Sequence, residues 1–138
     1  AEEYGYLYSY EAIMESGKDI CPEGYRMPTN AEWSALISKN GGPVFAGAKM
    51  KETTDLHWAT AANGVTNSAL TSVIPAGMAN ADGSCSGLGT RAYIWTTDEC
   101  ADNPNYGVAY QYSAEHNIVT KVNVKKEANI SIRCIKIK

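Results

Sequence analysis

The sequence predicts an α+β domain with short N-terminal helices, a long irregular loop region and a C-terminal antiparallel sheet. The helical patterns fall in the first 42 residues, whereas alternation of apolar and polar residues dominates the last third of the chain. With 138 residues, the chain is expected to form one domain, residues 1–138, that is large enough to bury a core.

The N-terminal third contains one strand pattern and two helix patterns. Residues 4–8 (YGYLY) favour a short strand, and residues 11–17 (EAIMESG) favour a short helix. A second helix is predicted over residues 30–39, because Thr29 and Glu32 have the spacing of a capping box. Its apolar face is expected to comprise Trp33, Leu36 and Ile37.

The middle of the chain, residues 43–92, is rich in Gly, Ala, Asn, Ser and Thr. Loop regions of this length are usually functional or irregularly packed. Three strands are predicted after it, at residues 91–97, 106–113 and 117–124, with a hairpin turn at 114–117.

A last strand is expected at residues 129–137, with Ile130, Ile132 and Cys134 on one face. The apolar pattern changes phase at Ile135, which indicates a bulge or a strand buried on both sides.

Composition and charge argue against several classes of partner. The formal net charge is −3, whereas nucleic-acid-binding proteins usually present a basic face. No stretch approaches the run of about 18 apolar residues of a membrane helix, so we expect no membrane insertion by this domain. The N-terminus lacks a signal-peptide pattern, which indicates a mature chain or a domain excised from a larger surface protein.

Four cysteines allow three disulfide pairings. Their wide spacing, with only His57 and His116 as further ligands, argues against a structural zinc site. Two disulfides in an oxidising compartment fit the sequence better, and four buried free thiols are the alternative.

Four segments carry a resemblance to a known family: YGYLYSYEAIM, CPEGYRMPTNAEW, GSCSGLGTRAYIWTTDE and SIRCIK. They stand in the order, and near the spacing, of motifs of the Fibrobacter succinogenes major paralogous domain family. The chain resembles this family over nearly its whole length, and the second segment is the most specific match. Members of the family are found in secreted and surface proteins of related bacteria.

The resemblance implies a C-type-lectin-like fold. In such folds a disulfide joins the first-helix region to the last strand, which matches Cys21 with Cys134. A second disulfide often closes the long loop, which Cys85 with Cys100 would do. The resemblance also places Trp33 and Trp95 in the core, and it implies an extracellular or cell-surface location, including attachment as an outer-membrane lipoprotein.

The expected function is that of a bacterial binding module that recognises a carbohydrate or a surface protein without covalent chemistry. Side-chain amides, carboxylates and tyrosine rings match sugar hydroxyls and apolar sugar faces, and they also match polar protein epitopes. The predicted ligand-binding residues lie between residues 82 and 112, with the last two included if their strand faces solvent: Asp82, Arg91, Asp98, Glu99, Asp102, Asn103, Asn105, Tyr106, Tyr110 and Tyr112.

No cofactor is expected, with calcium as the one exception to be tested. Five oxygen-bearing side chains fall within eight residues, and hard cations prefer oxygen ligands: Asp98, Glu99, Asp102, Asn103 and Asn105. A solvated acidic loop is the alternative interpretation, since the full triplets of calcium-dependent lectins are absent. Trp58, beside His57, is interpreted either as a sugar-stacking ring or as a core residue.

Two alternative functions remain. One is a protein-interaction or structural domain of an adhesin or surface appendage that has no glycan ligand. The other is a thiol enzyme related to the formylglycine-generating group, since GSCSG places Cys85 in a Gly-x-Cys-x-Gly sequence. A nucleophile elbow needs a strand before it and a helix after it, and a strand is predicted to follow here, so we expect no catalytic residues and no enzymatic activity.

Overall fold

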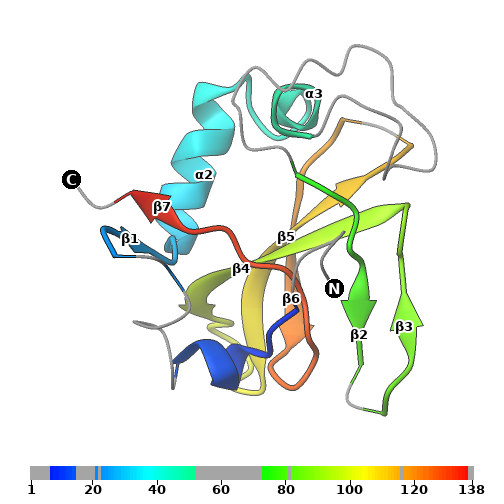
Figure 1. The fold of residues 1–138 in the computed structure, drawn as a ribbon. Coiled ribbons are helices and arrows are strands. Elements are labelled where there is room, and N and C mark those ends of the chain that lie inside the picture. The colour runs from blue at the N-terminus through cyan, green and yellow to red at the C-terminus, as the bar shows by residue number, and fades with distance from the viewer. Residues whose placement is uncertain are drawn as a thin grey trace.

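The fold is a mixed α/β arrangement with few helices and antiparallel sheets (Figure 1). The computed structural model describes residues 7–14, 21, 23–51, 73–80, 82–115 and 117–136. The main sheet has three antiparallel strands in the order β4 (Arg91–Glu99), β5 (Tyr106–Ser113) and β6 (Thr120–Lys125). The predicted strands at 91–97, 106–113 and 117–124 are therefore confirmed, with small changes at their ends.

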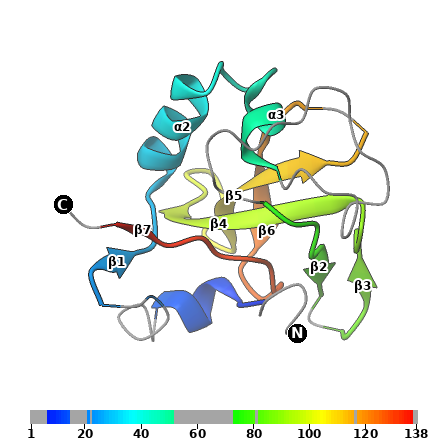
Figure 2. The same cartoon turned by 45° about the horizontal axis from the view of Figure 1, so that its top comes forward.

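The main sheet lies between helices on both of its faces (Figures 1 and 2). Helices α2 (Asn30–Lys39) and α3 (Ala46–Met50) cover one face, and the short helix of residues 10–14 covers the other. The helix predicted at 11–17 is thus confirmed over its described part. No helix in the described part of the chain is both long and apolar enough to span a membrane.

Each face of the sheet has its own apolar core. On the α2 side, Ile94 lies opposite Tyr110, and both pack with Trp33. On the other side, Trp95 lies opposite Ala109 and packs with residues of the N-terminal helix. The central strand β5 is therefore buried on both faces, because successive side chains of a strand point to opposite sides.

Helix α2 begins as the sequence predicts. Thr29 is the N-cap, its side chain accepts a hydrogen bond from the backbone N–H of Glu32, and the Glu32 carboxylate accepts one from the N–H of Thr29. Trp33 and Ile37 are buried and Leu36 is partly buried, which confirms the predicted apolar face.

Two small two-stranded sheets flank the main one. Strand β1 (Tyr25–Arg26) pairs with β7 (Ile135–Lys136), and β2 (Met78–Ala79) pairs with β3 (Cys85–Ser86). Next to the first of these, Cys21 and Cys134 form a disulfide with a Cα–Cα distance of 5.8 Å. The pairing that the resemblance implied for these two cysteines is confirmed.

The second predicted disulfide is wrong, since Cys85 and Cys100 are both free. Cys85 lies in β3, just before β4 begins, and Cys100 directly follows the other end of β4. A nine-residue strand is roughly 30 Å long, far more than a disulfide can bridge.

The strand predicted at 129–137 is confirmed only in part, because residues 129–131 and 135–136 are paired whereas residues 132–134 between them are not. Ile130 forms an isolated bridge with Tyr8, and the next residue, Ser131, bridges to Ile94 of β4 instead. The segment then pairs again only as the two-residue strand β7. Of the strand predicted at residues 4–8, the described part shows the Tyr8 bridge.

Candidate functional site

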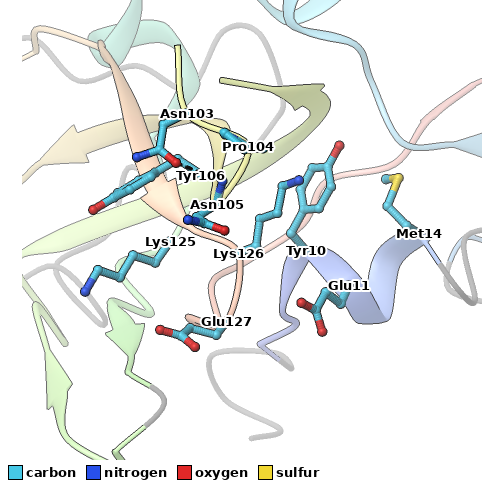
Figure 3. Close-up of a pocket in the computed structure, with 10 residues that line it drawn as sticks. All are labelled: Tyr10, Glu11, Met14, Asn103, Pro104, Asn105, Tyr106, Lys125, Lys126 and Glu127. Atoms are coloured by element: carbon cyan, nitrogen blue, oxygen red, sulfur yellow. Dashed lines mark hydrogen bonds between the residues drawn. The ribbon is translucent and has the colours of Figure 1, made fainter. Parts of the chain in front are cut away.

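A hollow with a volume of about 720 Å³ opens beside the loop between β4 and β5, and we call it the amide pocket. Three separate segments supply its lining (Figure 3). The residues are Tyr10, Glu11 and Met14 from the N-terminal helix, Asn103, Pro104, Asn105 and Tyr106 from the loop and the start of β5, and Lys125, Lys126 and Glu127 from the end of β6.

Backbone hydrogen bonds hold these three segments together. The N–H of Tyr106 donates to the carbonyl of Asn103 at 3.1 Å, which closes the loop. The N–H of Lys126 donates to the carbonyl of Asn105, and the N–H of Tyr10 donates to the carbonyl of Lys126, each at 3.0 Å. The position of each wall of the pocket is therefore fixed by backbone contacts.

The loop also uses side chains to set its shape. The side-chain oxygen of Asn103 accepts a hydrogen bond from the N–H of Asn105 at 3.0 Å, an Asx-type turn. The side chain of Asn105 is exposed, and Tyr106 is half-buried beside it. Asn103 and Asn105 therefore both line the pocket, and the side-chain oxygen of Asn103 is already used within the loop.

Tyr10 forms a rigid wall of the pocket. It is 4% exposed, and its hydroxyl donates to the carbonyl of Thr97 at 2.7 Å. Its ring makes an edge contact with the ring of Trp95, with 5.6 Å between centroids. Burial raises the pKa of Tyr10, and the nearby carboxylates of Glu99 and Asp98 raise it further, so the hydroxyl stays protonated and donating.

A cation lies over the ring of Tyr10. The Lys126 ammonium is 5.0 Å from the ring centroid of Tyr10 and 3.1 Å from a carboxylate oxygen of Glu99. Lys126 is thus held by a cation–π contact and an ion pair together. In contrast, Lys125 extends away from Tyr10 into solvent (Figure 3).

Gly107 allows Tyr10 to reach the sheet. A Cβ at this position would lie 2.8 Å from a ring carbon of Tyr10 and 2.9 Å from a ring carbon of Trp95. Such distances are too short for carbon atoms in van der Waals contact. The glycine in β5 therefore provides the space in which both rings pack.

Three of the ten predicted binding residues line the amide pocket: Asn103, Asn105 and Tyr106. Asp102 is exposed nearby but does not line it. Asp82 and Arg91 lie elsewhere, since Asp82 bonds to Ser84 in the β2–β3 turn and Arg91 bonds to Ser113 at the far end of β4.

The condition attached to Tyr110 and Tyr112 is not met, because their strand does not face solvent. They are 5% and 1% exposed and belong to the core under α2. Tyr112 accepts a hydrogen bond from the Trp33 indole at 3.1 Å, and Tyr110 donates to the side-chain oxygen of Asn30 at 2.6 Å. Both side chains are therefore core residues and not part of a solvent-facing surface.

Two of the three carboxylates considered for calcium have protein partners, and the third, Asp102, is exposed. Asp98 accepts a hydrogen bond from the N–H of Asn30 at 2.9 Å, at the start of α2, and Glu99 pairs with Lys126. Among the residues that the structure describes, no three His, Cys, Asp or Glu side chains are grouped so that they could hold a metal ion.

Cys85 is exposed and free, as the thiol-enzyme alternative requires, but its surroundings differ from a nucleophile elbow. It lies in the two-residue strand β3 and is followed by a turn and the strand β4, with no helix after it. His57 and His116, the two imidazoles of the sequence, lie outside the described residues, as does Trp58.

Nothing in the sequence indicates the part of the pocket built by Tyr10, Glu11, Met14 and the segment of residues 125–127. These residues follow ordinary helix and strand patterns, and no local motif distinguishes them. They reach the pocket through long-range backbone bonds, such as that between Tyr10 and Lys126.

No curated protein and no solved structure matches the chain. The family model described as the Fibrobacter succinogenes major domain, however, matches residues 1–136 of the 138 residues. The predicted resemblance is thereby confirmed, and the chain belongs to the Fibrobacter succinogenes major domain family.

Proposed function

We propose that the chain is a secreted or surface-displayed bacterial binding module that recognises carbohydrate in the amide pocket. The observation that carries this proposal is the grouping of two side-chain amides, from Asn103 and Asn105, with the ring of Tyr106 at one open hollow. Amides donate to and accept from sugar hydroxyls, and an aromatic ring matches the apolar face of a sugar.

The charges at the pocket favour an uncharged ligand. Lys125 and Lys126 are balanced by Glu11 and Glu127 in the lining, and Lys126 already pairs with Glu99. A phosphate or nucleic-acid site would need an excess of positive charge. A neutral glycan can use the same polar groups without that excess.

The disulfide supports the proposed location and fold type. A bond such as Cys21–Cys134 forms and persists in oxidising compartments outside the cytosol, which agrees with a secreted protein or a lipoprotein at the cell surface. The C-type-lectin-like fold is part of the proposal, and it is supported by a disulfide that joins the segment before α2 to the last strand.

The test is a glycan-array screen of the oxidised protein, followed by titration calorimetry with the best hit. Asn105→Ala removes an exposed side chain while the backbone bonds of the loop stay, so a three- to tenfold loss of affinity is expected, roughly the value of one hydrogen bond. Tyr106→Ala is expected to lower affinity about tenfold, because it removes the stacking ring.

Matched controls come from exposed residues that do not line the amide pocket. Tyr25→Ala removes a tyrosine that is 43% exposed in β1, and Asn80→Ala removes an exposed asparagine before the β2–β3 turn. Both are expected to leave affinity unchanged. A blank array, run with calcium and with chelator, would contradict the carbohydrate proposal.

A protein-interaction or structural role is the second candidate, and a different surface favours it. Val44, Phe45 and Ile118 are 56%, 65% and 42% exposed. A backbone bond from the N–H of Val119 to the carbonyl of Pro43 brings their two segments together. For any protein that is found to bind the chain, this role predicts that binding is lost in Phe45→Ser and retained in Asn105→Ala.

A further inference from the structure

A second hollow, with a volume of about 340 Å³, adjoins the amide pocket, and we call it the methionine pocket. Its lining consists of Ile13, Met14, Arg26, Met27, Thr29 and Thr97. Met14 lines both hollows and is 47% exposed. The two hollows therefore meet at one flexible surface side chain, since a methionine has several freely rotating bonds.

A second contact links the two hollows. Tyr10 lines the amide pocket, and its hydroxyl donates to the carbonyl of Thr97, which lines the methionine pocket. In Figure 3 this hydroxyl points to the side on which Met14 lies, away from Lys125. The partition between the hollows thus includes the buried ring of Tyr10 and the exposed thioether of Met14.

The two hollows differ in chemistry. The amide pocket presents amide, ammonium and carboxylate groups, which suit sugar hydroxyls. The methionine pocket has buried apolar walls, since Ile13 and Met27 are 1% and 5% exposed, and it contains a single charged side chain. That side chain, Arg26, is already neutralised by its two-point pairing with Glu32.

A small neutral group with a methyl end and a carbonyl oxygen fits such a pocket. The methyl group would be buried against thioether and aliphatic carbons. The carbonyl oxygen needs only one of the five N–H groups of the Arg26 guanidinium, of which Glu32 and Met27 use three. An acetamido group has these two features. A carboxylate would gain little, because Glu32 already occupies the fork of the guanidinium.

We propose that the amide pocket and the methionine pocket are two subsites of one groove, which binds a linear glycan carrying N-acetyl groups. One sugar ring occupies the amide pocket, and the acetamido group of the next unit enters the methionine pocket past Met14. This inference rests on the carbohydrate-binding function proposed above and adds the length and the substituent of the ligand.

The test compares two matched ligand series by titration calorimetry: N-acetylglucosamine with its β-1,4-linked dimer to tetramer, and glucose with the corresponding cello-oligomers. We expect the N-acetylated dimer to bind at least tenfold more tightly than its monomer, because the second subsite is then filled. The cello-oligomers should show less than a threefold gain with length.

Thr97→Phe fills the methionine pocket and keeps the backbone carbonyl that Tyr10 uses. It should abolish the gain from monomer to dimer. Thr120→Phe, at an exposed position of β6, is the matched control and should bind like the wild type. Met14→Ser changes an exposed side chain and should reduce the gain in affinity from monomer to dimer at least threefold. This second variant keeps the test valid if Thr97→Phe does not fold.

The outcomes separate this inference from the function on which it rests. Affinity that does not depend on length, equal affinity for the two series, or a gain that survives both Thr97→Phe and Met14→Ser would overturn the two-subsite groove. A glycan without N-acetyl groups found on the array would also overturn it, although carbohydrate binding would stand. Absence of any sugar binding at millimolar concentration would overturn both.

Discussion

Replacing Gly107 by alanine tests whether the rings of Tyr10 and Trp95 are as tightly placed as the structure indicates. The added Cβ would lie 2.8 and 2.9 Å from ring carbons of these two residues. Neither ring can yield easily, because both are buried and each donates a hydrogen bond: Tyr10 to the carbonyl of Thr97 and Trp95 to that of Tyr8.

The expected cost follows from two opposing effects. Overpacking of a core costs about 1 to 3 kcal/mol, while alanine in a strand gains about 0.5 to 1 kcal/mol over glycine by restricting the unfolded chain. Gly107 has no positive φ that would add strain. We therefore expect Gly107→Ala to lower the free energy of unfolding by about 1 to 2 kcal/mol, or Tm by roughly 5 °C.

Urea unfolding, monitored by tryptophan fluorescence, measures this loss of stability. A double-mutant cycle shows how much of the loss arises from the contact with Tyr10. In a Tyr10→Ala background one of the two obstructing rings is absent, so the same glycine substitution should cost at least 0.5 kcal/mol less. Equal costs in the two backgrounds, or a change below 0.5 kcal/mol in the wild type, would refute the proposed packing. Because Tyr10 is a wall of the amide pocket, the shape of that pocket should change as well.

Three further predictions concern the disulfide and two ionisable groups. Replacing Cys21 and Cys134 by serine should lower the free energy of unfolding by about 5 kcal/mol, the loop-closure value for a separation of 113 residues, and a loss below 2 kcal/mol in urea unfolding would contradict it. The Arg26 guanidinium and the N–H of Thr29 lower the pKa of Glu32 to about 2, so its stabilisation is complete above pH 5 and is lost as the pH falls towards 2. Glu32→Gln should remove about 1 kcal/mol at pH 7, because the carboxylate is partly exposed and screened, and almost nothing at pH 2. Burial lowers the pKa of Lys51 from 10.5 to about 8, so the folded state disfavours the charged amine and stability should rise, by about 2 kcal/mol, between pH 8 and pH 10. Denaturant titrations of the wild type and of Lys51→Met, which lacks the amine, measure that rise as the difference between the two proteins. The same pH dependence of stability in both proteins would contradict the prediction.

The sequence predicts elements well where local signals determine them. The capping box of Thr29 and Glu32 correctly places the start of α2, and the alternating tyrosines correctly delimit β5. The family motif that contains Cys21 correctly indicates its partner, Cys134. Each of these predictions depends on neighbouring residues or on a motif that spans few positions.

The sequence does not predict those features of the fold that depend on contacts between distant segments. Alternation along β5 identifies the two faces of the strand, but it does not show that helices cover both faces. The sequence therefore allows Tyr110 and Tyr112 to face solvent, although both are core residues. The nearness of Cys85 and Cys100 in sequence conceals the length of β4 between them. For the same reason, Asn103 and Asn105 are found from sequence, whereas the helix that completes their pocket is not.

The disulfide also decides how the domain responds to mechanical load. A force that pulls the N-terminal segment against the C-terminal end passes through the covalent bond between Cys21 and Cys134, so the enclosed sheet bears little tension. The segment before Cys21 is peeled first, and it carries Tyr10, Glu11 and Met14 of the amide pocket. Tension should therefore open the amide pocket while the sheet stays folded. In optical tweezers the oxidised protein should lengthen by no more than roughly 70 Å, the reach of about 20 residues, and a longer extension would exclude this mechanism.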